Sequence, residues 1–140
     1  MMPTRILVIE KDEFLRERLV SVFTQAGFTT VDASDYREAQ SAMVSFSPEV
    51  IIMDTVLADK DGFEACSELH SSLGIPIILV GQEDSRQAWR KAVDSGADFY
   101  LVRPFDCDEA LVARVNAILR RCRKDGNSRH KKSGARTPFE

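Results

Sequence analysis

The 140-residue sequence predicts an α/β domain in which a parallel β-sheet lies between two layers of helices. Two observations support this fold class. Five short segments have the composition of strands, and each is followed by a stretch whose apolar residues recur at helical spacing. Several of the strands are continuous apolar runs, as expected of strands buried on both faces. Strict alternation of such strands with helices is typical of a parallel sheet covered on both sides.

The predicted strands differ in polarity. They are residues 5–10, 28–33, 49–54, 76–80 and 99–102. The first, third and fourth (RILVIE, EVIIMD and PIILV) are apolar almost throughout, which indicates burial. The second, FTTVDA, is more polar and suits the edge of the sheet.

The helices are predicted from apolar stripes and from the residues that begin and end them. Leu15, Leu19, Val22 and Phe23 form the first stripe, which stops at Gly27. The other four helices are a stripe from Ala39 to Phe46 capped by Ser34 or Asp35, residues 63–73, a helix from Asp84 or Ser85 to Gly96, and one from Asp106 or Asp108 to about Cys122.

Charge divides the chain into a body and a tail. The net charge is −3, but residues 120–140 hold eight Lys or Arg side chains against two acids. We therefore expect one domain over residues 1–122. Residues 123–140 are then a basic, disordered tail or a linker to an output domain that these 140 residues lack. No apolar run approaches the ~20 residues of a membrane span, so no membrane contact and a cytoplasmic location are expected.

Polar side chains gather where the predicted strands end. Residues 10–12 (EKD) follow the first strand, Asp54 to Val56 end the third, Gly81 and Gln82 follow the fourth, and Arg103 follows the fifth. Ligands of open parallel sheets bind outside the carboxyl ends of the strands. Acids on two strands and a cation on another predict a site for a metal ion or for phosphate chemistry.

Residues 4–122 resemble the receiver domain of two-component response regulators. The resemblance is carried by ILVIEKDEFLRERL, PEVIIMDTVLADKDGFEACSEL, IPIILVG, DSGADFYLVRPFD and EALVARVNAILRR, in that order. It implies a flavodoxin-like three-layer fold with five βα units and strand order 2-1-3-4-5. It also implies that Asp54 accepts a phosphoryl group from a sensor histidine kinase or a phosphotransfer protein. The last helix is similar to that of regulators with a winged-helix output domain, through which alone nucleic acid would be bound.

The resemblance assigns a role to each residue at the strand ends. It implies a Mg²⁺ ion held by Asp54, Glu10 and the backbone carbonyl of Val56. The phosphoryl oxygens would be bound by Thr55, Gly81, Gln82 and Arg103. It further implies a cis peptide between Arg103 and Pro104.

Four positions depart from the family pattern. Lys11 replaces an acid that contacts the metal, Gly81 replaces a Ser or Thr, Arg103 replaces a lysine, and Ala58 replaces a proline. Mg²⁺ binding is therefore expected to be weak or absent. The alternative function is a pseudo-receiver, which binds or dimerises without phosphorylation. At most the domain would phosphorylate itself from a donor and slowly lose the group, with no separate substrate turnover.

Lys11 has three interpretations. It could point to solvent while Asp12 serves as a ligand, it could pair with Asp54 in place of the metal, or it could mark a site that has decayed. The second is favoured on physical grounds, because an ammonium beside two carboxylates relieves their repulsion.

The last two helices and the last strand are where the resemblance places a switch and a homodimer interface. Tyr100 is the switch aromatic, or else an ordinary residue of a sheet edge. Between two copies, Lys91 would pair with Glu109 and Asp98 with Arg114, while Phe99 replaces an acid of the family's third pair.

Overall fold

A computed structural model describes residues 3–103 and 108–125 of the protein. Strands and helices alternate along the chain. In order they are β1 (Arg5–Ile9), α1 (Glu13–Gln25), β2 (Thr29–Ala33), α2 (Tyr36–Phe46), β3 (Val50–Asp54), α3 (Gly62–Leu73), β4 (Ile77–Gly81), α4 (Arg86–Asp94), β5 (Phe99–Val102) and α5 (Asp108–Asp125).

The five strands form one parallel sheet with the order β2-β1-β3-β4-β5. The predicted fold class and strand order are therefore confirmed. The polar strand β2 lies at an edge, and every residue of the central strands β3 and β4 is buried. The apolar runs of the sequence thus belong to the strands that helices cover on both faces.

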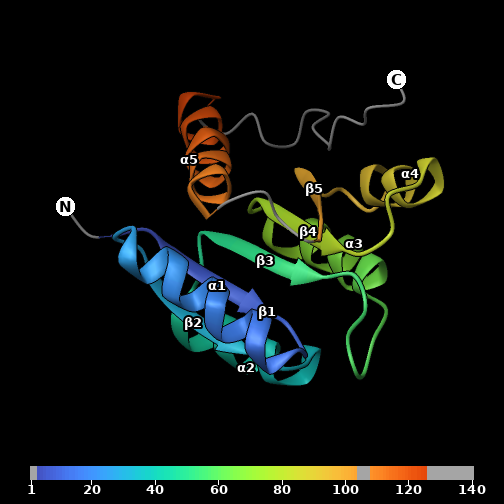
Figure 1. Cartoon of the computed structure of the whole chain (residues 1–140), viewed down its shortest axis with the longest axis horizontal. Coiled ribbons are helices and arrows are strands. Elements are labelled where there is room, and N and C mark those ends of the chain that lie inside the picture. Colours follow the sequence, from blue (N-terminus) through green and yellow to red (C-terminus); the bar gives the residue numbers. More distant parts are fainter. Residues whose placement is uncertain (1–2, 104–107, 126–140) are drawn as a thin grey trace.

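Helices α1 and α5 cover one face of the sheet, and α2, α3 and α4 cover the other (Figure 1). Successive residues of β1 serve opposite layers: Ile6 and Val8 pack with α1 and α5, whereas Leu7 and Ile9 pack with the other three helices. This follows from the two-residue period of a strand. None of the described helices is long and apolar enough to cross a membrane.

Side-chain caps begin four of the helices, and the sequence predicts two of them, at Asp35 and Ser85. Asp12, Asp35, Asp61 and Ser85 each accept a hydrogen bond from the backbone N–H three residues further on. Helix α5 begins at Asp108 and continues through Asp125, beyond the predicted end at Cys122. Arg123 and Lys124 are good helix formers, so the sequence offers no stop signal at that point. The predicted tail beyond residue 125 and the Arg103–Pro104 peptide lie outside the described residues.

The first residue of α3 packs directly against the end of β3. Gly62 donates its N–H to the carbonyl of Thr55 at 2.9 Å. A Cβ atom at Gly62 would collide with the backbone, at 2.5 Å from Thr55 Cα and also against the carbonyl oxygen of Asp54. Backbone atoms cannot move aside as a flexible side chain can. Helix α3 can therefore start below Asp54 only if residue 62 is glycine.

We predict that Gly62→Ala destabilises the domain by about 3 kcal/mol, at the upper end for an overpacked position. Gly74→Ala is the matched control, because Gly74 has a positive φ of 68° but open space around its Cα. Its cost should be only roughly 1–2 kcal/mol of left-handed strain. Urea denaturation measures both free energies of unfolding. Equal losses would contradict a close contact specific to Gly62.

Candidate phosphoryl-acceptor site

The carboxyl ends of β1, β3, β4 and β5 meet at one edge of the sheet. Asp54 is paired with Val80 across β3 and β4, and Gly81 with Val102 across β4 and β5. The N–H of Thr55 continues the ladder to the carbonyl of Val80 at 2.9 Å. The predicted gathering of strand-end residues is therefore present in the fold.

Asp54 is a buried carboxylate with two fixed partners. It is 1 % exposed. Its Oδ1 accepts a hydrogen bond from the N–H of Val56 at 3.0 Å, and its Oδ2 lies 3.4 Å from Nη2 of Arg103. The guanidinium is itself mostly buried, with a side-chain exposure of 17 %. Arg103 and Asp54 thus form a long ion pair.

Glu10 is a second buried carboxyl group beside Asp54. It is 1 % exposed, and its Oε2 accepts a hydrogen bond from the N–H of Asp12 at 3.1 Å. Burial, together with the neighbouring Asp54 carboxylate, raises the pKa of Glu10 to about 8, although the Asp12 N–H and Arg103 oppose the shift. Oε1 of Glu10 is buried without a hydrogen-bond partner among the described residues. Two ionised carboxylates can only accept hydrogen bonds. A protonated Glu10 has a hydrogen-bond donor that can point toward Asp54.

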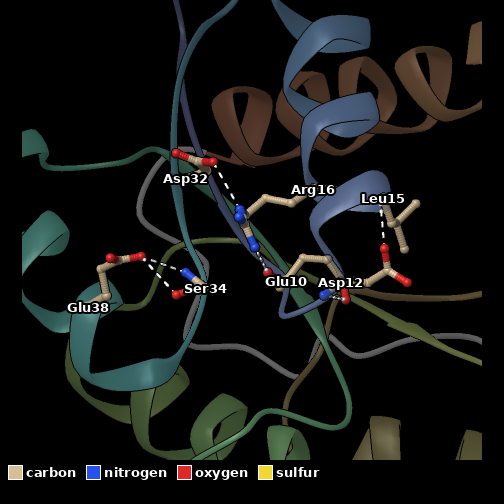
Figure 2. A network of polar contacts seen from close by, with 7 residues as sticks. All are labelled: Glu10, Asp12, Leu15, Arg16, Asp32, Ser34 and Glu38. Atoms are coloured by element: carbon tan, nitrogen blue, oxygen red, sulfur yellow. Dashed lines mark hydrogen bonds and ion pairs between the residues drawn. The ribbon is translucent and has the colours of Figure 1, made fainter.

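The backbone of Glu10 is held by α1 and β2. Figure 2 shows Arg16 reaching from α1 to the carbonyl of Glu10, at 2.9 Å, and to Asp32 of β2, at 3.2 Å. The same view shows Asp12 turned toward Leu15, whose N–H it accepts at 3.0 Å. These contacts fix the backbone at the end of β1 and so place the Glu10 side chain at the carboxyl edge of the sheet.

Among the described residues, the hydrogen-bond and ion-pair partners of Asp54 are Val56 and Arg103, not Lys11 or Asp12. Lys11 and Asp12 are both exposed, and Asp12 is engaged as the cap of α1. Among the residues that the structure describes, the ion pair of Asp54 is formed by Arg103 and not by Lys11. The favoured interpretation of Lys11 as the cation paired with Asp54 is therefore wrong for this structure, because Arg103 takes that role. Lys11 lines the cleft above the site instead.

The carboxyl groups that this edge of the sheet offers to a Mg²⁺ ion are those of Glu10 and Asp54. Mg²⁺ prefers several carboxylate, carbonyl and water oxygens in octahedral geometry. Within residues 3–103 and 108–125, no group of three His, Cys, Asp or Glu side chains is placed to hold a metal ion. Only Glu10 and Asp54 face each other here, and Arg103 already faces one of the Asp54 oxygens. A proton on Glu10 and the guanidinium of Arg103, rather than a third acid, accompany the two carboxyl groups.

A cleft of about 750 Å³ opens above Asp54. Of the predicted phosphate-binding residues, Thr55 and Gln82 line it together with Arg103. Its wall also holds the cations Lys11 and Lys91 and the acids Asp61 and Glu83.

Gly81 and Tyr100 are packed against each other beside this cleft. Tyr100 is 1 % exposed, and its hydroxyl donates to the carbonyl of Glu83 at 2.7 Å. A Cβ atom at Gly81 would meet the ring, with Cε1 at 2.9 Å and the hydroxyl closer still. Burial raises the pKa of Tyr100. The predicted switch aromatic therefore points inward.

The residues predicted at a homodimer interface are only partly available. Asp98 is buried, and its Oδ2 accepts a hydrogen bond from the N–H of Ile77 at 2.9 Å. The guanidinium of Arg114 lies 4.1 Å from the centre of the Phe99 ring of its own chain. Asp98 is thus bonded within its own chain. Lys91 and Glu109 are both exposed.

Sequence reasoning missed the anchors of the loop between β3 and α3. Asp59 accepts hydrogen bonds from the N–H groups of Tyr36 and Arg37, at 2.9 and 3.0 Å, and those bonds lower the pKa of Asp59. Lys60 pairs with Glu64 and Glu68 of α3, at 3.3 and 2.9 Å. The sequence indicates that an Asp in a turn can cap backbone N–H groups. It does not indicate that Asp59 binds the first turn of α2, 23 residues earlier in the chain.

A five-stranded parallel sheet with a buried aspartate at the end of its central strand is the arrangement of a signalling receiver. The chain belongs to the response regulator receiver domain family, whose model matches residues 6–116. Membership of this family implies phosphoryl acceptance in two-component signalling.

Two relatives are named as response regulators. The chain is 37% identical over 125 residues to "Response regulator MprA" of Mycolicibacterium vanbaalenii, covering 89% of this chain and 54% of that protein. It is 35% identical over 120 residues to "DNA-binding response regulator MtrA" of Mycobacterium leprae, covering 86% and 53%. The chain therefore spans about half the length of these relatives.

Solved structures support the same fold. A two-component response regulator from Clostridium difficile superposes with a TM-score of 0.80 at 30% identity, over 84% of this chain and 97% of that one. A CheY-like receiver domain protein from Methanospirillum hungatei reaches 0.82 at 21% identity, over 89% and 99%, and bears on the fold alone.

We predict that Glu10→Gln stabilises the domain at alkaline pH. The pKa of Glu10 is about 8 in the folded protein against 4.5 for a free side chain, so wild-type stability falls as pH rises between these values. The variant should match the wild type near about pH 5 and exceed it by on the order of 3 kcal/mol near about pH 9. Urea denaturation at both values tests this. Glu17→Gln, on the exposed surface of α1, is the control. A difference independent of pH would contradict the assigned pKa.

We predict weak Mg²⁺ binding that Lys11→Asp tightens, because this change removes a cation from the cleft and adds a carboxylate. Amide shifts of Asp54 and Val56 during a magnesium titration give the affinity. Lys91→Asp is the matched control, since it reverses the same charge elsewhere on the cleft wall. Saturation of the wild type at sub-millimolar magnesium would show that the acid lost at position 11 is not needed.

Proposed function

We propose that the chain is a phosphorelay receiver that takes a phosphoryl group on Asp54 from a phosphohistidine of a sensor kinase or phosphotransfer protein. The observation that supports this most is the position of the Asp54 carboxylate, buried below a cleft and held by Val56 N–H and Arg103. In the transfer, an Asp54 oxygen attacks the phosphorus and the P–N bond breaks. The electron pair returns to the imidazole nitrogen, and an acyl phosphate forms.

Arg103 is the residue we assign to charge stabilisation. Its guanidinium faces Oδ2 of Asp54, and its Nε is buried without a hydrogen-bond partner among the described residues. A phosphoryl oxygen on Asp54 would give this donor an acceptor. Lys11 and Lys91 add positive charge at the rim, and Gln82 adds an amide. Gly81 brings no hydroxyl, so the transfer is expected to be slow.

The alternative is a pseudo-receiver that binds partners without phosphorylation. The ion pair between Arg103 and Asp54 favours it, since the pair neutralises the carboxylate without a metal. In neither case do we propose turnover of a separate substrate. A homodimer through α4, β5 and α5 stays a weaker proposal, supported by exposed Lys91 and Glu109 but not by Asp98. We propose a cytoplasmic location, and DNA contact only through an output domain like that of the DNA-binding relatives.

We predict slow phosphorylation of Asp54 by a small-molecule phosphodonor, measured as the mass gain of one phosphoryl group on the intact protein, with and without magnesium. Asp54→Asn should abolish the gain. Arg103→Ala should slow it by roughly a hundredfold, the usual cost of one lost transition-state donor. Arg103→Lys should restore most of the rate, because it keeps the charge.

Lys91→Ala is the control for a general loss of positive charge and should slow the reaction far less than Arg103→Ala. An unmodified wild type, under conditions that phosphorylate an ordinary receiver, would reject this function in favour of the pseudo-receiver.

A further inference from the structure

The loop between β3 and α3, residues 55–61, is tied to the start of a different helix, and we call it the acceptor loop. Asp59 lies in this loop, and its two carboxylate oxygens bind different N–H groups of α2. Oδ1 accepts from Tyr36 at 2.9 Å, and Oδ2 accepts from Arg37 at 3.0 Å. These are the first two N–H groups of the helix, which have no partner within it. Asp59 therefore caps a helix that precedes it in the chain.

The start of α2 is a fixed point of the fold. Tyr36 and Ala39 are buried in the core on that side of the sheet. The third N–H of the helix, that of Glu38, is bound at 2.8 Å by Asp35, the residue before the helix. Asp35 and Asp59 thus share the capping of α2, one from its own segment and the other from the acceptor loop. The two bonds of Asp59 hold the acceptor loop against a well-packed part of the chain.

The acceptor loop also orients the acceptor carboxylate. Val56, near its start, donates its N–H to Oδ1 of Asp54 at 3.0 Å. Val56 also forms an antiparallel bridge with Asp61 at the end of the loop, and Leu57 between them is buried. A carboxylate with one oxygen held in this way cannot rotate freely about its Cβ–Cγ bond. The Val56 N–H therefore sets where the other oxygen, next to Arg103, faces.

Lys60 fastens the other side of the acceptor loop more weakly. Its Nζ lies 3.3 Å from Glu64 and 2.9 Å from Glu68 of α3. Both acids are more than half exposed, and ion pairs in water contribute little. The bonds of Asp59 differ, because they satisfy backbone donors that the first turn of a helix leaves open. Asp59 is therefore the stronger of the two anchors.

We propose that Asp59 is a positioning residue for phosphoryl transfer, which acts on Asp54 through the acceptor loop and Val56. It keeps the Val56 N–H on Oδ1, so that the other oxygen holds one direction toward an incoming phosphorus atom. Attack requires aligned atoms, and small displacements from that geometry are costly. Ala58 does not restrict the loop backbone as a proline would, so this restraint comes from the Asp59 side chain. The proposal rests on the proposed function in taking Asp54 as the acceptor.

Hydrogen exchange of the Val56 amide tests this link without any phosphodonor. In Asp59→Ala this amide should exchange about tenfold faster than in the wild type, the size of effect that a lost helix cap has on local opening. Asp59→Asn keeps one acceptor oxygen, so its exchange rate should lie between the two. Asp35→Ala is the matched control, because it removes a bond to the same helix from outside the acceptor loop. It should leave the exchange of Val56 unchanged.

The rate of phosphorylation shows whether this position of Val56 matters for transfer. With a small-molecule phosphodonor, the mass gain should be about tenfold slower in Asp59→Ala and unchanged in Asp35→Ala, although both variants uncap α2 and lower the urea midpoint. Equal Val56 exchange in the two variants, or equal rates of mass gain, would overturn the proposal. A wild type without a mass gain would reject the proposed function, and Val56 exchange would still decide whether Asp59 holds the acceptor.

Discussion

Glu10 and Asp54 bring two carboxyl groups together in the interior, at the ends of neighbouring strands, and two buried negative charges cannot stay unbalanced there. The polar groups around this edge are arranged to satisfy that constraint. Backbone N–H groups of Asp12 and Val56 each bind one carboxyl oxygen. Arg103 supplies a positive charge, and a proton held on Glu10 removes a negative one. The end of β1 is fixed from outside by Arg16 so that this geometry persists.

The residues at positions 11, 81 and 103 are better explained as a set than one by one. Position 11 is a lysine, and within the described part of the chain no third acid joins the pair. The longer side chain of Arg103 then delivers its charge to Asp54 itself. Gly81 leaves space at the end of β4, and the buried ring of Tyr100 fills it. Arg103 thus balances the charge of the acceptor, and Tyr100 fills the space beside Gly81.

The loop after Asp54 is tied to two helices by side-chain contacts. Ala58 stands where the family has the proline, yet the loop is fastened to two helices. Asp59 binds the first N–H groups of α2, and Lys60 pairs with two acids of α3 while lying 5.5 Å from the centre of the Tyr36 ring. The start of α3 is in turn fixed by the close approach of Gly62. The backbone that presents Asp54 is therefore held by contacts with its surroundings.

The sequence by itself determined the order of elements, the caps of α2 and α4 and the meeting of Glu10, Asp54, Gly81 and Arg103 at one edge. It could do so because hydrophobic period, capping and strand ends are local properties, and parallel strands bring their ends together. Only the tertiary structure decided which cation reaches Asp54, that Asp12 caps a helix, and that Asp98 and Tyr100 turn inward. Those contacts join residues 17 to 49 positions apart, apart from the local cap. Whether a side chain reaches a given atom depends on packing between elements, which no local pattern encodes.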